Sequence, residues 1–295
     1  MLLQKYFDVR KKMINQALDK YIGAEDNYPP ELYQAMRYST LDGGKRLRPI
    51  LMMAVYEMIK GKNNLRSLKV VLPPACALEM VHTASLIHDD LPFIDDSDER
   101  RGKPSCHKKF GNAIAILAGD ALLTKAFGIM LEPNNKKKAI ICLDILTKSI
   151  ATRGMISGQV VDILVTRKKA KLHMLRDIHI KKTGSLLKAA VLIACVLADA
   201  EEQQMNALAD FAINIGLAYQ IIDDILDEVG ANEILQKETG EDERNEKVTY
   251  PVLIGLEESQ KQAIKLLKDA NNLIKNMDNN IVLMEFVKMI RDRMP

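Results

Sequence analysis

The sequence predicts an all-α protein, a single-domain bundle of about ten or more helices. Apolar residues recur at three- and four-residue steps along most of the chain, as they do on amphipathic helices. No stretch alternates apolar and polar residues between turn signals, so strands are expected to be incidental. Neither a fixed repeat nor a Pro/Ser/Gly linker divides the 295 residues, and we therefore expect one domain over residues 1–295.

The expected helices follow from this periodicity and from the residues that interrupt it. An apolar stripe over residues 3–21 gives the first helix, and Pro29-Pro30 suits the first turn of a second that ends near Gly43-Gly44. Asp199 with Glu202, and Ser259 with Gln262, have the spacing of capping boxes. The other helical patterns cover 46–60, 73–91, 113–131, 136–165, 172–183, 185–198, 201–227 and 259–293, the last broken near 279–280.

Composition excludes several classes of protein. With 47% hydrophobic and 27% charged residues, the chain is neither disordered nor fibrous. A net charge of +3 gives no support for a nucleic-acid partner. The four cysteines lack CxxC or zinc spacing and are expected to be reduced, and the longest apolar run, 189–198, is about half the ~20 residues that span a bilayer. Charge comes too early for a signal peptide, so we expect a soluble cytoplasmic protein without a membrane span.

Long polar segments at 92–111 and 230–247 interrupt the helical pattern, and two groups of aspartates stand beside them. The first acidic cluster consists of Asp89, Asp90 and Asp95, and the second of Asp223, Asp224 and Asp227. Residues four apart share a helix face, so Asp223 and Asp227 are expected to project together. Asp89 and Asp95 would lie on different faces of an ideal helix, but Pro92 should break or kink it and turn both toward one point.

Carboxylates gathered in this way repel one another and need a positive counterion. Hard oxygen ligands without a Cys or His chelate favour Mg²⁺, which shares its coordination shell with water and phosphates. One such cluster alone would be explained by a solvated acidic face. Two clusters, each following an apolar helical run, favour a metal site.

Basic residues gather in several short segments that suit diphosphate oxygens. Each segment alone is explained by surface charge, and the neighbouring acidic clusters give them their significance. The segments are Gly43-Gly44-Lys45-Arg46-Leu47-Arg48, Arg100-Arg101-Gly102-Lys103, Lys182-Thr183-Gly184, and the pair Lys237 and Lys247.

His82 precedes Asp89 by about two helical turns and lies on the same face. The alternative is that His82 is a core residue whose ring nitrogens have hydrogen-bond partners within the protein. Glu79 and His82 also form ExxH, the spacing found in di-iron helical bundles, but such a site needs a second pair that this sequence lacks. The sequence also contains no GxGxxG, P-loop or GxSxG pattern.

Taken together, these motifs resemble those of trans-isoprenyl diphosphate synthases, above all the bacterial farnesyl diphosphate synthases or geranyltranstransferases. The resemblance covers about residues 45–251 and rests on DDxxxxD paired with DDxxD, on GGKRLRP, HDD with RRGKP, KTG and K-x-TYP in the family's order. It implies helices around a deep central cavity, the isoprenoid synthase fold, and a homodimer. One departure is Gln236, where the family usually has glycine.

The resemblance also implies roles for individual residues. Asp89, Asp95 and Asp223 would hold Mg²⁺, about three ions per active site, with help from Asp90, Asp224 and Asp227. Isopentenyl diphosphate would be bound by Lys45, Arg48, His82 and Arg101. The allylic diphosphate would be bound by Arg100, Lys182, Thr183, Gln220, Lys237 and Lys247. Gln159 and Asp162 match a polar pair facing the cavity, and the residues expected to act most directly in catalysis are Asp89, Asp95, Asp223, Lys182 and Gln220.

The reaction implied is ionisation of an allylic diphosphate, attack by the double bond of isopentenyl diphosphate, and loss of a proton. A terpene cyclase normally replaces the second aspartate motif with an Asn/Ser/Glu triad, and a non-catalytic synthase subunit is expected to lose aspartates. A purely structural bundle would not require Lys182-Thr183-Gly184 within a helix. The complete second cluster and this segment argue against all three alternatives.

The size of the product is predicted from the residues preceding Asp89. Farnesyl synthases similar to this chain typically carry tyrosine five residues before the first aspartate, where this sequence has Ala84. A small residue there favours a longer product, geranylgeranyl diphosphate. The remaining likeness favours farnesyl diphosphate, with Val81 or Phe127 as the floor of the pocket, and farnesyl diphosphate is the expected main product.

Overall fold

The computed structural model describes residues 2–61, 65–165, 171–235 and 248–295. This part of the chain is helical almost throughout, and its strands form a single two-stranded hairpin, which confirms the all-α prediction. The described residues divide into two compact units, residues 1–146 with 193–199 and residues 147–192 with 200–295. Helices α7 (Lys136–Ile150) and α10 (Ser185–Ala198) contribute residues to both.

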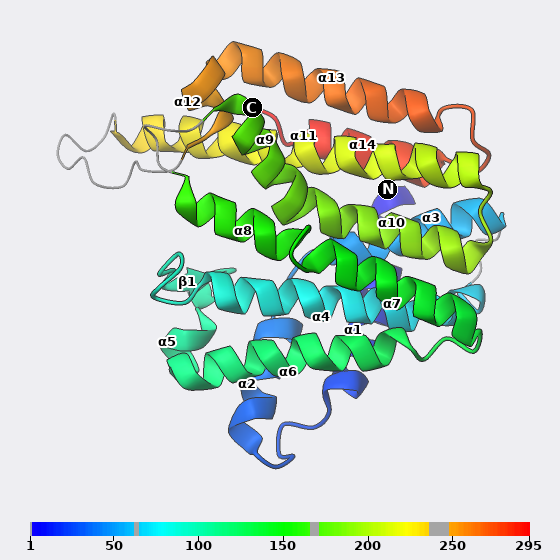
Figure 1. Ribbon diagram of the computed structural model, residues 1–295, viewed down its shortest axis with the longest axis vertical. Helices are drawn as coiled ribbons and strands as arrows, with labels where there is room; N and C mark the ends of the chain where they lie inside the picture. Colours follow the sequence, from blue (N-terminus) through cyan, green and yellow to red (C-terminus); the bar gives the residue numbers. More distant parts are fainter. Residues whose placement is uncertain (1, 62–64, 166–170, 236–247) are drawn as a thin grey trace. The chain divides into compact units, whose positions relative to one another are not determined.

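The first unit is built around two antiparallel helices, α4 (Leu72–Asp89) and α6 (Asn112–Met130), which lie side by side in Figure 1. A Cβ atom on Gly119 of α6 would lie 2.2 Å from His88 Nε2 of α4, so this glycine permits the close approach. The other elements of this unit are α1 (Leu2–Ile22), α2 (Pro30–Leu41), α3 (Leu47–Lys60), η1 (Ser67–Lys69), β1 (Glu99–Arg100), β2 (Lys103–Pro104) and α5 (Cys106–Phe110).

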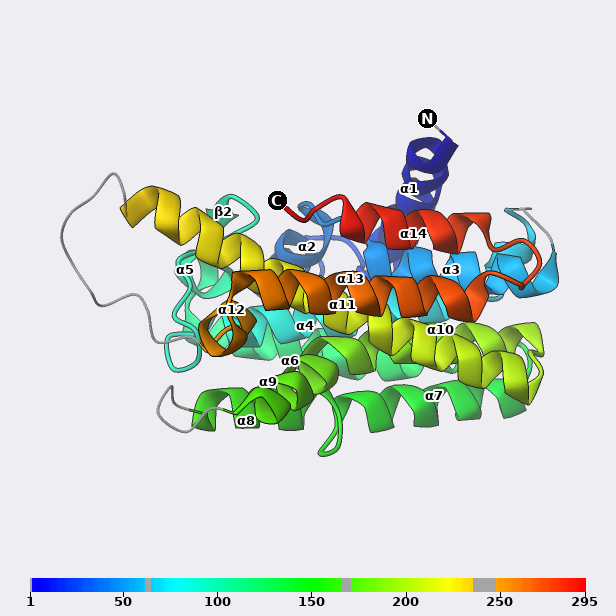
Figure 2. The same cartoon turned by 90° about the horizontal axis from the view of Figure 1, so that it is seen from above.

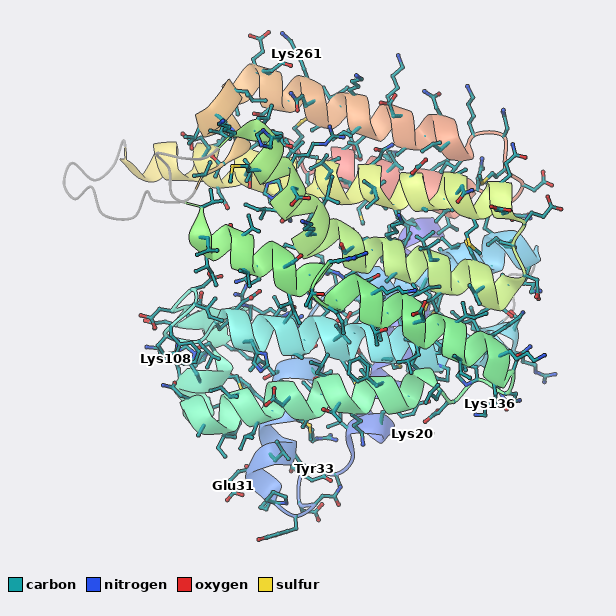
Figure 3. All side chains as sticks on the ribbon, in the orientation of Figure 1. Lys20, Glu31, Tyr33, Lys108, Lys136 and Lys261 are labelled. Atoms are coloured by element: carbon teal, nitrogen blue, oxygen red, sulfur yellow. The ribbon has the colours of Figure 1, made fainter. Side chains whose placement is uncertain are left out.

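The second unit is dominated by α11 (Glu202–Leu235), along which α13 (Leu256–Ile274) packs, as Figure 2 shows. The apolar stripe of α13 is buried, while charged side chains such as Lys261 point away from the helix in Figure 3. This unit also contains α8 (Met155–Leu164), α9 (Leu172–His179), the π-helical turn η3 (Ile180–Gly184), α12 (Tyr250–Ile254) and α14 (Ile281–Arg291).

Several expected boundaries are wrong. The helix predicted over 136–165 is two helices, because the chain turns at Gly154, whose ideal Cβ would lie 1.9 Å from the Ser149 carbonyl oxygen. Helix α11 continues past Gly230 to Leu235, into the segment predicted to be a loop. The expected break near 279–280 is confirmed, since α13 ends at Ile274 and α14 begins at Ile281.

Neither predicted capping box forms. Asp199 adopts a positive φ of 58° and its carboxylate pairs with Lys60 and Lys138, with Nζ–O distances of 3.2 and 2.6 Å. Ser259 lies inside α13 and its hydroxyl donates to the Gly255 carbonyl at 2.8 Å. The spacing predicted that both side chains would cap a helix N-terminus. Instead, Asp199 binds lysines from other segments, and Ser259 binds a carbonyl one turn earlier in the chain.

All four cysteines are buried free thiols, as expected from their spacing. Burial raises the pKa of the Cys142 and Cys195 thiols to about 12, so both stay protonated at neutral pH.

Helix α6 and residues 202–230 of α11 are long and apolar enough to cross a membrane by length and composition alone. Each packs along another helix of its own unit, α6 on α4 and α11 on α13. Core helices of globular proteins commonly pass the same test, so the finding is weak support for a membrane span.

Candidate functional site

The first acidic cluster is assembled by a tight turn at the end of α4. Helix α4 ends at Asp89, and the backbone N–H of Asp95 donates to the Asp89 carbonyl at 2.9 Å. The chain therefore turns back around Pro92, as predicted, and the backbone of Asp95 lies against that of Asp89 at one helix end. The convergence of their carboxylates stays a prediction. The side chain of Asp95 is exposed and that of Asp89 is half-buried, so both carboxylates border solvent.

Asp90 has a different environment from its neighbours. It is buried and accepts hydrogen bonds from two nitrogens of Arg100: Nε lies 3.0 Å from Oδ1 and 3.2 Å from Oδ2, and Nη2 also donates to Oδ1. Hydrogen bonding to Asp90 raises the pKa of Arg100. The family resemblance assigns Asp90 a supporting role at the metal and Arg100 a role at the allylic diphosphate, and these roles stay predictions. In this structure the two side chains bind each other.

The hairpin β1–β2 presents Arg101 beside the glycine turn of the same unit. Arg101 and Gly102 occupy its two-residue turn with φ of 58° and 73°, the conformation that joins twisted strands. A Cβ on Gly44 would lie 3.0 Å from Arg101 Cζ, so the glycine allows the guanidinium to approach. Desolvation lowers the pKa of Arg101, and the guanidinium nonetheless remains charged.

His82 and Arg48 form a direct contact in this basic region. Arg48 Nη1 lies 3.1 Å from His82 Nε2, and because arginine only donates, His82 must accept through that nitrogen. Burial and the charge of Arg48 lower the pKa of His82 well below its ordinary value. His82 is therefore a neutral acceptor that orients a guanidinium.

The second acidic cluster lies on α11, with Asp223 and Asp227 one turn apart, as predicted. Arg293, beyond α14, places its Nη2 2.5 Å from Asp223 Oδ1, and its guanidinium carbon lies 4.2 Å from the centre of the Tyr219 ring. Gln220 Nε2 approaches Asp223 Oδ2 at 3.4 Å. Desolvation raises the pKa of Asp223, although Arg293 acts in the opposite direction.

Asp224 holds other elements of its unit together. Its Oδ2 accepts from His179 Nε2 at 3.0 Å and from the backbone N–H of Tyr250 at 2.9 Å. The His179 ring stacks on Tyr250 with centroids 5.5 Å apart. Asp224 thus joins α9, α11 and α12, a structural role that its position in DDxxD does not reveal. Asp227, by contrast, is exposed.

Lys182 and Thr183 lie in the π-helical turn η3, so the helix is distorted here without being broken. Such turns often occur at functional sites. A Cβ on Gly158 of α8 would lie 2.8 Å from the Lys182 backbone nitrogen, so the two elements are in close contact. Lys182 Nζ lies 2.9 Å from Asp162 Oδ2, while the buried amide atoms of Gln159 have no hydrogen-bond partner among the described residues.

Sequence reasoning missed Arg293, His179 and the Arg46–Glu79 ion pair, whose Nη1–Oε1 distance is 2.8 Å. Their sequence signals are weak, because each interacts with a residue distant along the chain. Lys45 is exposed beside the glycine turn. Lys237, Lys247 and Gln236 lie outside the described residues.

The donor sets fit Mg²⁺. Across the described residues, no group of three or more His, Cys, Asp or Glu side chains is gathered closely enough to hold a metal alone. Each cluster offers carboxylates at a solvent border and no soft ligand, and Mg²⁺ usually completes its shell with water and phosphate oxygens. Asp89, Asp95, Asp223 and Asp227 are the residues that would hold it.

Comparisons with known proteins agree with this geometry. The polyprenyl synthetase family model matches residues 29–288. The chain is 43% identical to a geranylgeranyl diphosphate synthase of Cyanophora paradoxa, over 95% of this chain and 92% of the relative. It is 41% identical to a farnesyl diphosphate synthase of Bacillus subtilis, over 92% and 91%. The crystal structure of an FPP/GFPP synthase from Zymomonas mobilis matches with a TM-score of 0.87 and 28% identity over 98% of each chain.

Proposed function

The chain belongs to the polyprenyl synthetase family and is a prenyltransferase, and on this premise we propose that it makes farnesyl diphosphate in a Mg²⁺-dependent reaction. The substrates proposed are isopentenyl diphosphate and an allylic diphosphate, dimethylallyl or geranyl. The observation that carries the proposal is the pair of acidic clusters at solvent borders, each with cationic side chains in its own unit. Bound Mg²⁺ would neutralise the charge that develops on the departing diphosphate.

The residues of the chain itself have four tasks in this proposal. Lys45, Arg48 and Arg101 bind isopentenyl diphosphate, and neutral His82 keeps the Arg48 guanidinium oriented. Lys182 stabilises the negative charge of the allylic diphosphate as the C–O bond breaks. The apolar residues of α4 exclude water from the allylic cation. The released diphosphate accepts the proton, so no side chain is required as a base.

Product length is proposed from α4 and α6, which pack against each other within the first unit. His88 Nε2 lies 3.2 Å from the Ile116 carbonyl oxygen, which aligns the start of α6 with the end of α4. Phe127, which is half-buried, lies about three helical turns beyond Ile116 along α6, and this separation corresponds to roughly 16 Å. One turn is comparable to one isoprene unit, so Phe127 at this level supports a fifteen-carbon product.

One observation favours a second candidate. Ala84 is buried on α4, five residues before Asp89, and offers no bulk that would stop a growing chain. Geranylgeranyl diphosphate is therefore the alternative product, and relatives named for each product match this chain. A homodimer is also part of the proposal, supported by family resemblance, and light scattering tests it. A cytoplasmic location stays a prediction from the sequence.

The test is a product assay with purified protein, Mg²⁺, geranyl diphosphate and excess isopentenyl diphosphate. Release of diphosphate, abolished by chelator, is expected, with a fifteen-carbon product on chromatography. A predominantly twenty-carbon product would overturn the farnesyl assignment and leave the prenyltransferase intact. Ala84→Tyr is expected to suppress any longer by-product, and Leu117→Tyr, at an exposed position of α6, is the control for added bulk.

A further inference from the structure

Arg46, within the basic segment 45–48, forms a buried ion pair with Glu79 of α4. Neither residue has a role in the function proposed above. Arg46 Nη1 is 2.8 Å from Glu79 Oε1, and the two side chains are 0% and 2% exposed. Desolvation of two charges commonly offsets most of their attraction, and apolar replacements of such pairs are often neutral or stabilising. Stability alone therefore gives a poor reason for this pair.

The other donors of Arg46 fix the segment that surrounds Lys45. Its Nε donates to Asn15 Oδ1 at 2.8 Å, and its Nη2 donates to the Thr40 carbonyl near the end of α2. A Cβ on Gly44 would lie 2.8 Å from Arg46 Nη1, so the glycine turn wraps directly over the guanidinium. Lys45 is thus held between a close-fitting turn and a buried anchor.

The backbone of Arg46 is itself unusual. Its φ of 54° is in the left-handed region, which is unfavourable for a residue other than glycine. Strain of this kind persists only where surrounding contacts enforce it, and it is concentrated at functional sites. The contacts that enforce it here are those of the Arg46 guanidinium.

Helix α4 supplies partners to both arginines of the segment. Glu79 binds Arg46, and His82, three residues later on the same face, binds Arg48 at 3.1 Å. The ExxH motif noted in the sequence is therefore occupied by two guanidinium groups, which excludes it as half of a di-iron site.

We propose that Glu79 and His82 form an arginine clamp in which Arg46 and Glu79 are positioning residues for isopentenyl diphosphate. The clamp sets the register of residues 45–48, so that Lys45 and Arg48 face one diphosphate together. This inference rests on the proposed function, because it assumes that Lys45 and Arg48 bind that substrate. Neither Arg46 nor Glu79 touches the substrate itself, since both are buried.

The test replaces the pair by apolar residues of similar volume, Arg46→Met with Glu79→Met. We expect folding to be retained and the KM for isopentenyl diphosphate to rise about tenfold, equivalent to about 1.4 kcal/mol. The KM for geranyl diphosphate is expected to stay unchanged. Calorimetric titration with isopentenyl diphosphate should show the same loss of affinity without turnover.

A matched control exists in the same unit. Arg10 and Glu57 form a second buried pair, with an Nη2–Oε1 distance of 2.6 Å and side chains 5% and 7% exposed. Tyr6 donates its hydroxyl to Glu57 at 2.6 Å. The triple variant Tyr6→Phe, Arg10→Met, Glu57→Met removes an equivalent buried network, and both KM values should remain those of the wild type.

The outcomes separate the inference from the function on which it rests. An unchanged KM for isopentenyl diphosphate in the folded double variant overturns the clamp alone, as does an equal rise in the control. Failure of the wild type to condense the two substrates overturns both. If the double variant does not fold, Glu79→Gln serves instead, and it should raise only the KM for isopentenyl diphosphate.

Discussion

Asp223 is a half-buried carboxylate whose pKa is raised by desolvation, with Arg293 opposing the shift. The folded state therefore binds the proton more tightly than the unfolded chain, whose pKa is near 3.8. Stability attributable to Asp223 is lost as the pH rises from about 4 through the folded-state pKa. We predict that Asp223→Asn increases the free energy of unfolding at pH 7 but lowers kcat about 10³-fold.

Urea unfolding at pH 4 and pH 7, together with single-turnover rates, checks this prediction. The gain in stability over the wild type should be larger at pH 7 than at pH 4. Asp210→Asn, at an exposed position on the same helix, is the control and should change neither quantity. A loss of stability in Asp223→Asn at pH 7 would show that its pairing with Arg293 outweighs desolvation.

His82 gives a pH prediction of the opposite sign. Burial and Arg48 lower its pKa below the ordinary 6.5, so below about pH 6.5 the unfolded chain gains a proton that the folded protein does not. Wild-type stability should therefore fall from pH 6.5 downward, and His82→Gln should reduce that dependence. Imidazole nitrogen NMR should report neutral His82 with its proton on Nδ1 at pH 6, and a protonated ring there would refute the assignment.

At the scale of elements, the π-helical turn η3 is held by close backbone contact with α8. An ideal Cβ on Gly158 would lie 2.8 Å from Lys181 Cβ and from the Lys182 backbone nitrogen. Because these atoms are not the ends of flexible side chains, the backbone of η3 or α8 would have to shift to make room. We predict that Gly158→Ala lowers stability by about 1–3 kcal/mol and lowers kcat about tenfold through displacement of Lys182. Gly128→Ala, where no atom lies within 4 Å, should raise stability by about 0.5–1 kcal/mol. Thermal unfolding and steady-state rates measure both variants, and equal behaviour would contradict the packing argument.

Helix existence was predictable because apolar periodicity is a local signal. The expected helices over 46–60 and 113–131 match α3 and α6 to within a residue. Turn positions that depend on close backbone contacts were not predictable. At Gly154 the turn depends on the nearby Ser149 carbonyl, and a pattern of apolar residues carries no information about that contact. The hairpin β1–β2 was missed because two-residue strands are too short to alternate.

The candidate site was predictable in its residue types and less so in its pairings. Spacing located both acidic clusters, and Pro92 predicted the reversal that joins Asp89 to Asp95. Spacing could not reveal that the second aspartate of each cluster has partners within the protein. Asp90 binds Arg100. Asp224 accepts hydrogen bonds from His179 and from the backbone of Tyr250. Those partners come from other segments, and only the folded chain brings them together.

At the scale of the whole molecule, the two acidic clusters belong to different compact units. Because each carries carboxylates suited to Mg²⁺, one reaction that needs both clusters would make the units functionally inseparable. Groups that act as one unit in a transition state show strongly non-additive losses when removed singly and together. Groups that act independently lose free energy additively. Kinetics can therefore detect cooperation between the units without any assumption about their arrangement.

We predict that Asp89→Ala and Asp223→Ala each lower kcat about 10³-fold at saturating Mg²⁺, and that the double variant loses little more than either single one. Additive losses would instead give about a 10⁶-fold reduction, so the two outcomes differ by about 4 kcal/mol. Asp120→Ala, at an exposed aspartate of α6, combined with Asp223→Ala is the control cycle and should show no coupling. Single-turnover measurement of diphosphate release with geranyl and isopentenyl diphosphates gives the rates, and thermal unfolding verifies that each variant is folded. A fully additive double variant would mean that the clusters contribute to separate steps, and the expectation that one reaction needs both clusters would fall.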